Sequence, residues 1–174
     1  MSIEIYIGPM FAGKTTKLIS MYNNNENNSK IVIDFNEQFC IEKLKNHTTI
    51  ELENVYKGPS LVSIENKYKN IFSKKYIYIN ECQFFPDLKE FALKCLEKNI
   101  HIYLYGLDGD YKQDLFGQTM ELIPYCSYIE KIKGTCKICT KSSLVSHRTT
   151  NETSVYLPNS NLYIPLCLTC LKNK

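Results

Sequence analysis

The chain has 174 residues, of which 44% are hydrophobic and 22% are charged, and its formal net charge is +3. These values are typical of a soluble globular chain with one core of ordinary size, and they exclude a disordered chain. The mild charge requires neither a nucleic-acid nor a membrane partner, and no apolar run is long enough to span a bilayer. No cleavable leader precedes the first apolar segment, so we expect a cytoplasmic protein with reduced cysteines.

The first strong pattern lies at the beginning of the chain. Residues 3–7 predict a short apolar strand and residues 15–23 a helix, and the stretch between them fits G-x-x-x-x-G-K-[ST]: Gly8, Pro9, Met10, Phe11, Ala12, Gly13, Lys14 and Thr15. Such a loop turns successive N–H groups toward a polyphosphate, and the following helix directs its positive end at the same anion. We therefore expect a nucleoside triphosphate to bind here, with Lys14 on its β- and γ-phosphates and Thr15 on Mg²⁺. A chance match on a glycine-containing turn is the alternative, and the flanking strand and helix argue against it.

The following elements alternate between strand and helix. Residues 37–58 are ambiguous, with a short helix as one interpretation of 37–45 and loop and strand expected for the rest. Pro59 and Ser60 open a helix that reaches Phe72, and the capping-box pattern of Asp87 and Glu90 starts another that ends at Lys98. Further strands are expected over 30–34, 76–79, 100–105 and 128–133. This alternation predicts an α/β fold, a P-loop NTPase-like parallel sheet flanked by helices.

Chemistry is expected where these strands end. In parallel sheets, ligands bind at the carboxyl ends of the strands, and the glycine-rich loop, Glu81 and Leu107 all follow strands. Glu81 is our candidate for the general base of phosphoryl transfer, with Lys14 steadying the transferred charge. The alternative is a surface glutamate at a strand end. Phe84 and Phe85, seen alone, are typical of core residues.

The character of the chain changes near residue 134. Cysteines then occur in two pairs with 27 residues between them, Cys136/Cys139 and Cys167/Cys170. This C-x₂-C spacing is typical of a tetrahedral structural Zn²⁺ site, because two such turns present four thiolates to one ion. Four merely buried cysteines are the alternative, and a redox C-x-x-C fits less well. We divide the chain into a P-loop α/β domain (1–133) and a zinc-binding C-terminal domain (134–174).

Taken together, these motifs resemble the type II thymidine kinases, a family with a P-loop and a zinc-bearing lasso domain. The resemblance rests on the glycine-rich loop with its Pro-Met-Phe, the block from Glu81 to Asp87, Leu107-Asp108-Gly109 with Phe116-Gly117, and the two cysteine pairs. It spans nearly the whole chain.

The resemblance implies a transfer of phosphate from ATP to the 5′-hydroxyl of thymidine, with Glu81 as the catalytic base. It also implies that a lasso loop closes over the nucleoside. The positions that it places at the nucleoside are Met10, Phe84, Leu107, Phe116, Ser154, Val155, Tyr156, Leu157, Pro158 and Tyr163. It further implies a homotetramer that is inhibited by its end product dTTP.

Three positions depart from the family pattern. Asn80 replaces an aspartate that helps to hold Mg²⁺, residues 34–48 lack the arginine of the family's Asp-x-Arg motif, and Pro158-Asn159 replaces a pair of glycines. These departures keep two other functions open. One is a nucleotide-binding regulator derived from such a kinase, and the other is a zinc-ribbon nucleic-acid binder, although one arginine makes a weak electrostatic footprint.

Overall fold

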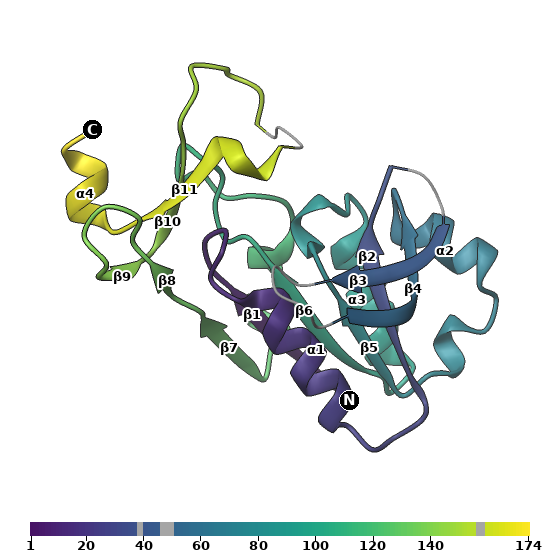
Figure 1. Ribbon diagram of the computed structural model, residues 1–174. Helices are drawn as coiled ribbons and strands as arrows, with labels where there is room; N and C mark the ends of the chain where they lie inside the picture. Colours follow the sequence, from purple (N-terminus) through teal and green to yellow (C-terminus); the bar gives the residue numbers. More distant parts are fainter. Residues whose placement is uncertain (38–39, 46–50, 156–158) are drawn as a thin grey trace.

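The computed structural model describes residues 1–37, 40–45, 51–155 and 159–174. Its centre is a seven-stranded sheet (Figure 1) in the order β3-β4-β2-β5-β6-β1-β7. The strands are β1 (Ser2–Ile7), β2 (Lys30–Phe35), β3 (Cys40–Lys45), β4 (Glu51–Gly58), β5 (Tyr76–Ile79), β6 (His101–Gly106) and β7 (Tyr128–Lys131). Only the β3–β4 pair is antiparallel among these described strands. The predicted α/β fold with a mainly parallel sheet is confirmed.

Helices cover both faces of this sheet because each strand alternates two sets of apolar side chains. Helix α1 (Lys14–Asn24) buries Leu18 and Ile19 in a cluster with tyrosines of the sheet. Helices α2 (Leu61–Lys67) and α3 (Leu88–Glu97) bury Ile64 and Phe91 against the isoleucines on the other face. Each fully buried side chain of this size stabilises the fold by about 1.5–3 kcal/mol.

The helix expected over 37–45 is wrong for residues 40–45, which form strand β3. Residues 38–39 lie outside the described part of the chain. Strand β3 pairs with β4, and this pairing buries Leu44 together with Leu52 and Val55 on the face that α1 covers. Burial against a partner strand therefore outweighs the local helix preference of the segment.

The ends of two predicted helices also differ. Helix α2 begins after its predicted cap, where Ser60 accepts a hydrogen bond from the N–H of Ser63 at 3.1 Å, but it ends at Lys67, and a separate 3₁₀ turn covers Ile71–Ser73. Asp87 makes no side-chain hydrogen bond to α3, the helix that follows it. Its carboxylate instead accepts the first N–H groups of α2, at 3.0 and 2.7 Å. The predicted capping box is wrong. The carboxylate of Asp87 instead accepts the N–H groups at the start of α2, which have no partner within that helix.

The strand register brings several loops to one edge of the sheet. Ile7 at the end of β1 pairs with Gly106 and Lys131, and Ile79 at the end of β5 pairs with Ile33 and Leu104. The residues that follow β1, β2, β5 and β6 therefore leave the sheet at the same edge.

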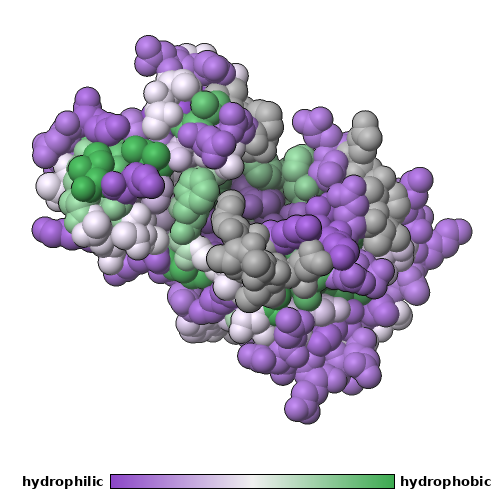
Figure 2. Space-filling model, viewed as in Figure 1, coloured by the Kyte–Doolittle hydropathy of each residue, from purple (hydrophilic) through white to green (hydrophobic). Residues whose placement is uncertain are grey.

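Beyond β7 the chain forms two small hairpins. Strand β8 (Gly134–Thr135) pairs with β9 (Ser142–Ser143), and β10 (Val145–Arg148) pairs with β11 (Tyr163–Leu166). A 3₁₀ turn, η4 (Ser160–Leu162), precedes β11, and helix α4 (Leu168–Lys172) follows it. The buried apolar core of this part consists of Cys136, Leu166 and Cys167. Figure 2 shows hydrophobic surface at this end of the molecule, around α4, where Leu168 is half exposed.

The described helices are all too short or too polar to cross a lipid bilayer.

Candidate active site

The loop between β1 and α1 turns tightly at two glycines. Gly8 has φ 155°, and a Cβ atom there would lie 2.1 Å from the carbonyl oxygen of Ile132, so a larger residue cannot occupy this position without moving the chain. Gly13, with φ 86°, precedes the first residue of α1. The N-terminus of α1 therefore faces the loop, which is the arrangement that favours a bound phosphate.

Lys14 is the charged side chain of this loop. It is 8% exposed, and its Nζ donates hydrogen bonds to the carbonyl oxygens of Gly8 and Pro9 at 3.1 and 2.8 Å. Burial lowers the pKa of Lys14, and the negative charges of Glu81 and Asp108 act in the opposite direction. These neighbours hold an ammonium group within the loop, where a polyphosphate needs a positive partner.

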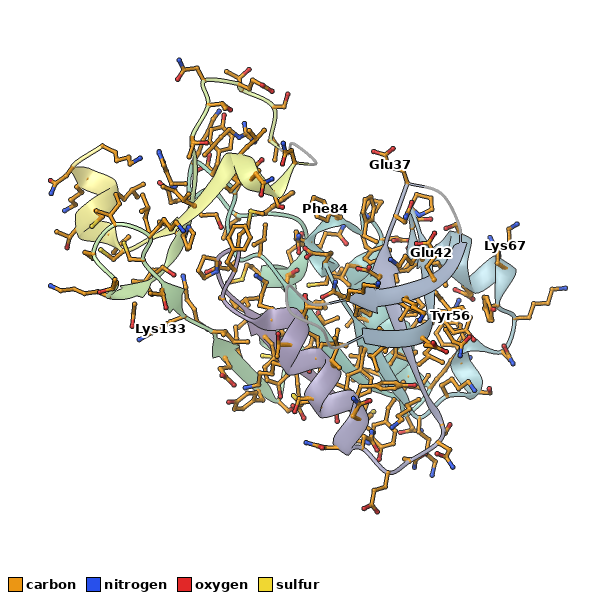
Figure 3. All side chains as sticks on the ribbon, viewed as in Figure 1. Glu37, Glu42, Tyr56, Lys67, Phe84 and Lys133 are labelled. Atoms are coloured by element: carbon orange, nitrogen blue, oxygen red, sulfur yellow. The ribbon has the colours of Figure 1, made fainter. Side chains whose placement is uncertain are left out.

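A cavity of about 500 Å³ opens at this edge of the sheet. The predicted site residues that line it are Met10, Phe11, Ala12, Gly13, Lys14, Thr15, Glu81, Phe84, Leu107, Phe116, Val155 and Tyr163. Gly8, Pro9 and Ser154 do not line it, and Tyr156, Leu157 and Pro158 lie outside the described residues. Figure 3 places Phe84 at this edge, between the sheet and the C-terminal part.

Glu81 follows β5 in an unusual backbone conformation. Its φ and ψ are 49° and 40°, a left-handed region that costs energy for a residue with a Cβ atom and that is concentrated at functional sites. Its carboxylate accepts a hydrogen bond from the Nε2 of Gln83 at 2.7 Å, and the Oε1 of Gln83 accepts the N–H of Leu107 at 3.0 Å. Gln83 is 3% exposed and thus connects the ends of β5 and β6. No sequence pattern pointed to Gln83, although a polar residue two positions after Glu81 is a usable signal.

The two phenylalanines after Glu81 have different environments. Phe85 is 1% exposed and belongs to the core between the sheet and α3, as its residue type suggests. Phe84 lines the cavity, and its ring lies 5.1 Å from that of Phe35 and 5.2 Å from that of Phe116, in a T-shaped contact with the latter. These rings form an apolar wall on the side of the cavity that faces the glycine-rich loop.

Arg148 holds the residues that follow β10, of which Val155 lines the cavity. This arginine, the only one in the sequence, is 3% exposed at the end of β10. Its guanidinium donates to the carbonyl oxygens of Glu152, Ser154 and Val155 at 2.7, 2.5 and 3.1 Å, and to the hydroxyl of Tyr163 at 2.7 Å.

Tyr111, which follows β6, contacts the same segment. Its ring lies 3.7 Å from the Cζ of Arg148, and its hydroxyl donates to the carbonyl oxygen of Thr153 at 3.2 Å. A second connection joins the glycine-rich loop to β10, since the N–H of Met10 donates to Ser146 Oγ at 2.8 Å. Sequence patterns did not identify Tyr111, Ser146 or Arg148, because no motif marks the groups that these residues contact.

The four paired cysteines come together in the C-terminal part. Their sulfur atoms all lie within 4.8 Å of one another, and the Sγ atoms of Cys139 and Cys167 are 3.6 Å apart. A tetrahedron of Zn–S bonds about 2.3 Å long has edges of about 3.8 Å, so this geometry fits a zinc ion. The N–H of Cys170 donates to Cys167 Sγ at 3.4 Å and lowers the pKa of the Cys167 thiol, which favours the thiolate form that binds metal. This cluster of thiols could hold a structural Zn²⁺.

Known proteins resemble the chain over its whole length. Residues 1–171 match the family described as "Thymidine kinase". The chain is 31% identical to the thymidine kinase of Amsacta moorei entomopoxvirus, with 99% of each chain covered, and 32% identical to that of Choristoneura biennis entomopoxvirus, with 98% and 96% covered. It is 30% identical to the thymidine kinase of Oryza sativa subsp. japonica, where the match covers 95% of this chain and 64% of the rice protein.

Proposed function

We propose that ATP is the phosphoryl donor for this chain and that the products are dTMP and ADP. The chain belongs to the thymidine kinase family and phosphorylates thymidine. One observation carries this proposal. A single cavity is lined by Lys14 and Thr15 of the glycine-rich loop, by Glu81, and by the aromatic rings of Phe84, Phe116 and Tyr163. Phosphate-binding, proton-accepting and base-packing groups thus share one space.

The triphosphate binds at the glycine-rich loop. The N–H groups of the loop and of the first turn of α1 donate to phosphate oxygens, and Lys14 turns from its carbonyl partners to the β- and γ-phosphates. Phosphoryl transfer requires mainly positioning and neutralisation of charge, and both groups supply it.

Mg²⁺, when bound, neutralises the charge shared by the β- and γ-phosphates. The oxygen atoms that would hold it are the Thr15 hydroxyl and the side-chain amide oxygen of Asn80, which lie 3.4 Å apart. Oxygen donors are the ligands that Mg²⁺ prefers, so the site fits this ion. Zn²⁺, by contrast, belongs to the thiols of Cys136, Cys139, Cys167 and Cys170.

Glu81 takes the proton of the thymidine 5′-hydroxyl. Gln83 fixes the carboxylate through one of its two oxygens, and the other oxygen can accept the proton. A base placed in this way raises the nucleophilicity of the hydroxyl oxygen as it attacks the γ-phosphorus in line with the leaving ADP.

The nucleoside occupies the part of the cavity between the aromatic wall and the segment that Arg148 holds. Apolar rings on one side and main-chain groups on the other recognise a pyrimidine by its shape and by its hydrogen-bond pattern. We assign this contact to Met10, Phe84, Leu107, Phe116, Tyr163 and the segment 154–158, whose described residues are Ser154 and Val155.

The family resemblance supports further proposals about the same chain. These are a division into domains at residue 134, a homotetrameric assembly, a cytoplasmic location, and inhibition by dTTP in the thymidine site.

A coupled assay of ADP release tests the proposed activity. Purified protein with Mg²⁺ and ATP should release ADP only when thymidine is added, and release should stop when EDTA removes the metal. Deoxyuridine and deoxycytidine in parallel reactions measure the selectivity for the base. Absence of ADP release from zinc-loaded protein at saturating thymidine and ATP would overturn the proposal and favour a regulator.

Replacing Arg148 with lysine should raise the KM for thymidine about tenfold or more and leave the Kd of ATP unchanged. Hydrogen bonds from a charged donor contribute about 1.5–3 kcal/mol each, and an ammonium group cannot reproduce the planar set that holds Glu152, Ser154 and Val155. Steady-state kinetics and ATP titration measure the two quantities. The matched control is Lys141→Met, which removes an exposed cation from the same part of the chain. An unchanged KM in Arg148→Lys would mean that this segment does not position the nucleoside.

A further inference from the structure

Asp34 and Asn80 lie side by side at the edge of the sheet where the nucleotide site is. Strands β2 and β5 are parallel neighbours, and Ile33 pairs in register with Ile79, so the next residues, Asp34 within β2 and Asn80 after β5, lie at the same level. The Nδ2 of Asn80 donates a hydrogen bond to Asp34 Oδ1 at 2.9 Å. Both side chains are buried, with exposed fractions of 7% for Asp34 and 4% for Asn80, and both line the cavity.

This contact fixes the orientation of the Asn80 amide. The NH₂ group of Asn80 donates to the carboxyl group of Asp34, so the amide oxygen of Asn80 faces away from Asp34. That oxygen accepts a hydrogen bond from Thr15 Oγ1 at 3.4 Å. A continuous path of polar contacts therefore runs from the hydroxyl of the glycine-rich loop through Asn80 to the carboxylate of Asp34.

We propose that Asp34 supplies, through Asn80, the negative charge that the cation of the nucleotide site requires. P-loop enzymes hold Mg²⁺ with the hydroxyl that follows the loop lysine and with a strand-end aspartate. In this chain the strand end next to Thr15 is an amide, which carries no charge, and the nearest carboxylate on that path is one hydrogen bond further away, on β2. Asp34 acts as a positioning residue, because it turns the amide oxygen of Asn80 toward the cation and adds its charge behind it. This inference rests on the proposed use of Mg²⁺ with ATP.

Lys57 provides a competing explanation of Asp34. At the end of β4, the Nζ of Lys57 lies 3.5 Å from Asp34 Oδ2 and 3.7 Å from Glu42 Oε2, and its side chain is 13% exposed. A purely structural Asp34 would serve only to neutralise this lysine. The two roles use different oxygens of the carboxylate, Oδ1 toward Asn80 and Oδ2 toward Lys57, and they predict different effects of metal.

The test measures how strongly Mg²⁺ tightens ATP binding. Calorimetric titration without nucleoside gives the Kd of ATP in EDTA and in saturating Mg²⁺, and the ratio of the two values isolates the contribution of the metal. For Asp34→Asn we expect this ratio to fall about 10–100-fold relative to the wild type, which is the usual effect of losing a group that supports a metal ligand, with the Kd in EDTA unchanged. Asp34→Ser, whose hydroxyl can still bond to Asn80, must show the same loss and serves if Asp34→Asn does not fold.

The most discriminating variant exchanges the two side chains. The double variant Asp34→Asn/Asn80→Asp returns a carboxylate to the same path, one hydrogen bond closer to Thr15. It should recover the ratio of the Kd of ATP in EDTA to that in Mg²⁺, which falls in Asp34→Asn. Lys57→Met is the matched control, since it breaks the ion pair and keeps the carboxylate, and its ratio should stay at the wild-type value.

The outcomes separate this inference from the proposed function. If wild-type protein binds ATP equally well with and without Mg²⁺, both the cofactor proposal and the role of Asp34 are overturned. If the wild type shows the magnesium effect and Asp34→Asn or Asp34→Ser retains it, only the role of Asp34 is overturned, and the carboxylate is then a structural partner of Lys57.

Discussion

Replacing Glu81 with glutamine should lower kcat by about 10²–10⁴-fold, the usual contribution of a general base, and leave the Kd of ATP within about twofold of the wild type. The replacement has the same shape and removes only the ability to take a proton. Its amide oxygen can still accept the hydrogen bond from Gln83 Nε2, which measures 2.7 Å in the wild-type chain, so the left-handed turn at this position should persist. The loss should therefore fall on the chemical step and not on the fold.

ADP release at saturating thymidine measures kcat for this variant, and calorimetry measures the Kd of ATP. Glu121→Gln is the matched control, because it makes the same chemical change at an exposed carboxylate that pairs with Lys89 at 2.9 Å and does not line the cavity. If Glu81→Gln kept the wild-type kcat, Glu81 would not be the general base. A weaker affinity for ATP with unchanged kcat would instead assign Glu81 to nucleotide binding.

Replacing Cys139 with serine should abolish zinc binding and destabilise residues 134–174. This part buries only three residues in its own apolar core among those described, and two of them are paired cysteines. Apparent binding free energies of structural zinc are about 10–16 kcal/mol in small metal-dependent domains, which is far more than such a core supplies. With one ligand lost, we expect a lower Tm, faster proteolysis between the two cysteine pairs, and a large rise in the KM for thymidine.

The metal content gives a readout that does not depend on activity. Elemental analysis should find about one zinc ion per wild-type chain and much less in Cys139→Ser. Cys126→Ser is the control, because this half-buried thiol lies outside the cluster and donates to the carbonyl oxygen of Ile123, a bond that a hydroxyl can also make. If the wild-type protein held no zinc and its Tm did not change when zinc was added, the four thiols would serve only as core residues.

The two predictions concern groups that are linked to one cavity. Glu81, whose carboxylate Gln83 holds, and Val155, whose carbonyl oxygen Arg148 holds, both line it. We propose that the zinc cluster keeps β10 and β11 rigid enough for Arg148 and Tyr163 to position the residues between them.

Features encoded in short continuous segments could be predicted from the sequence. The glycine-rich loop, the strand before it and the helix after it form one unit, and their geometry follows from the residues themselves. The same holds for each C-x₂-C turn, and for Glu81, which directly follows an apolar strand. The segment 37–45 shows the limit of this reasoning, because its strand forms through pairing with β4 and not through local preference.

The glycine-rich loop, the paired cysteines, the mainly parallel sheet and the position of Glu81 at a strand end were predictable from the residues alone, since each depends on contacts within a few residues or on a repeating pattern. Which other side chains contact them follows from the packing of the folded chain. The order β4-β2-β5 places Lys57, Asp34 and Asn80 side by side, and the β10–β11 hairpin surrounds Arg148 with the carbonyl groups that it holds. Neither arrangement has a local signal, because strand order and register are set by the burial of the whole sheet, and a polar residue at a strand end acquires its partner only when the neighbouring strand is in place.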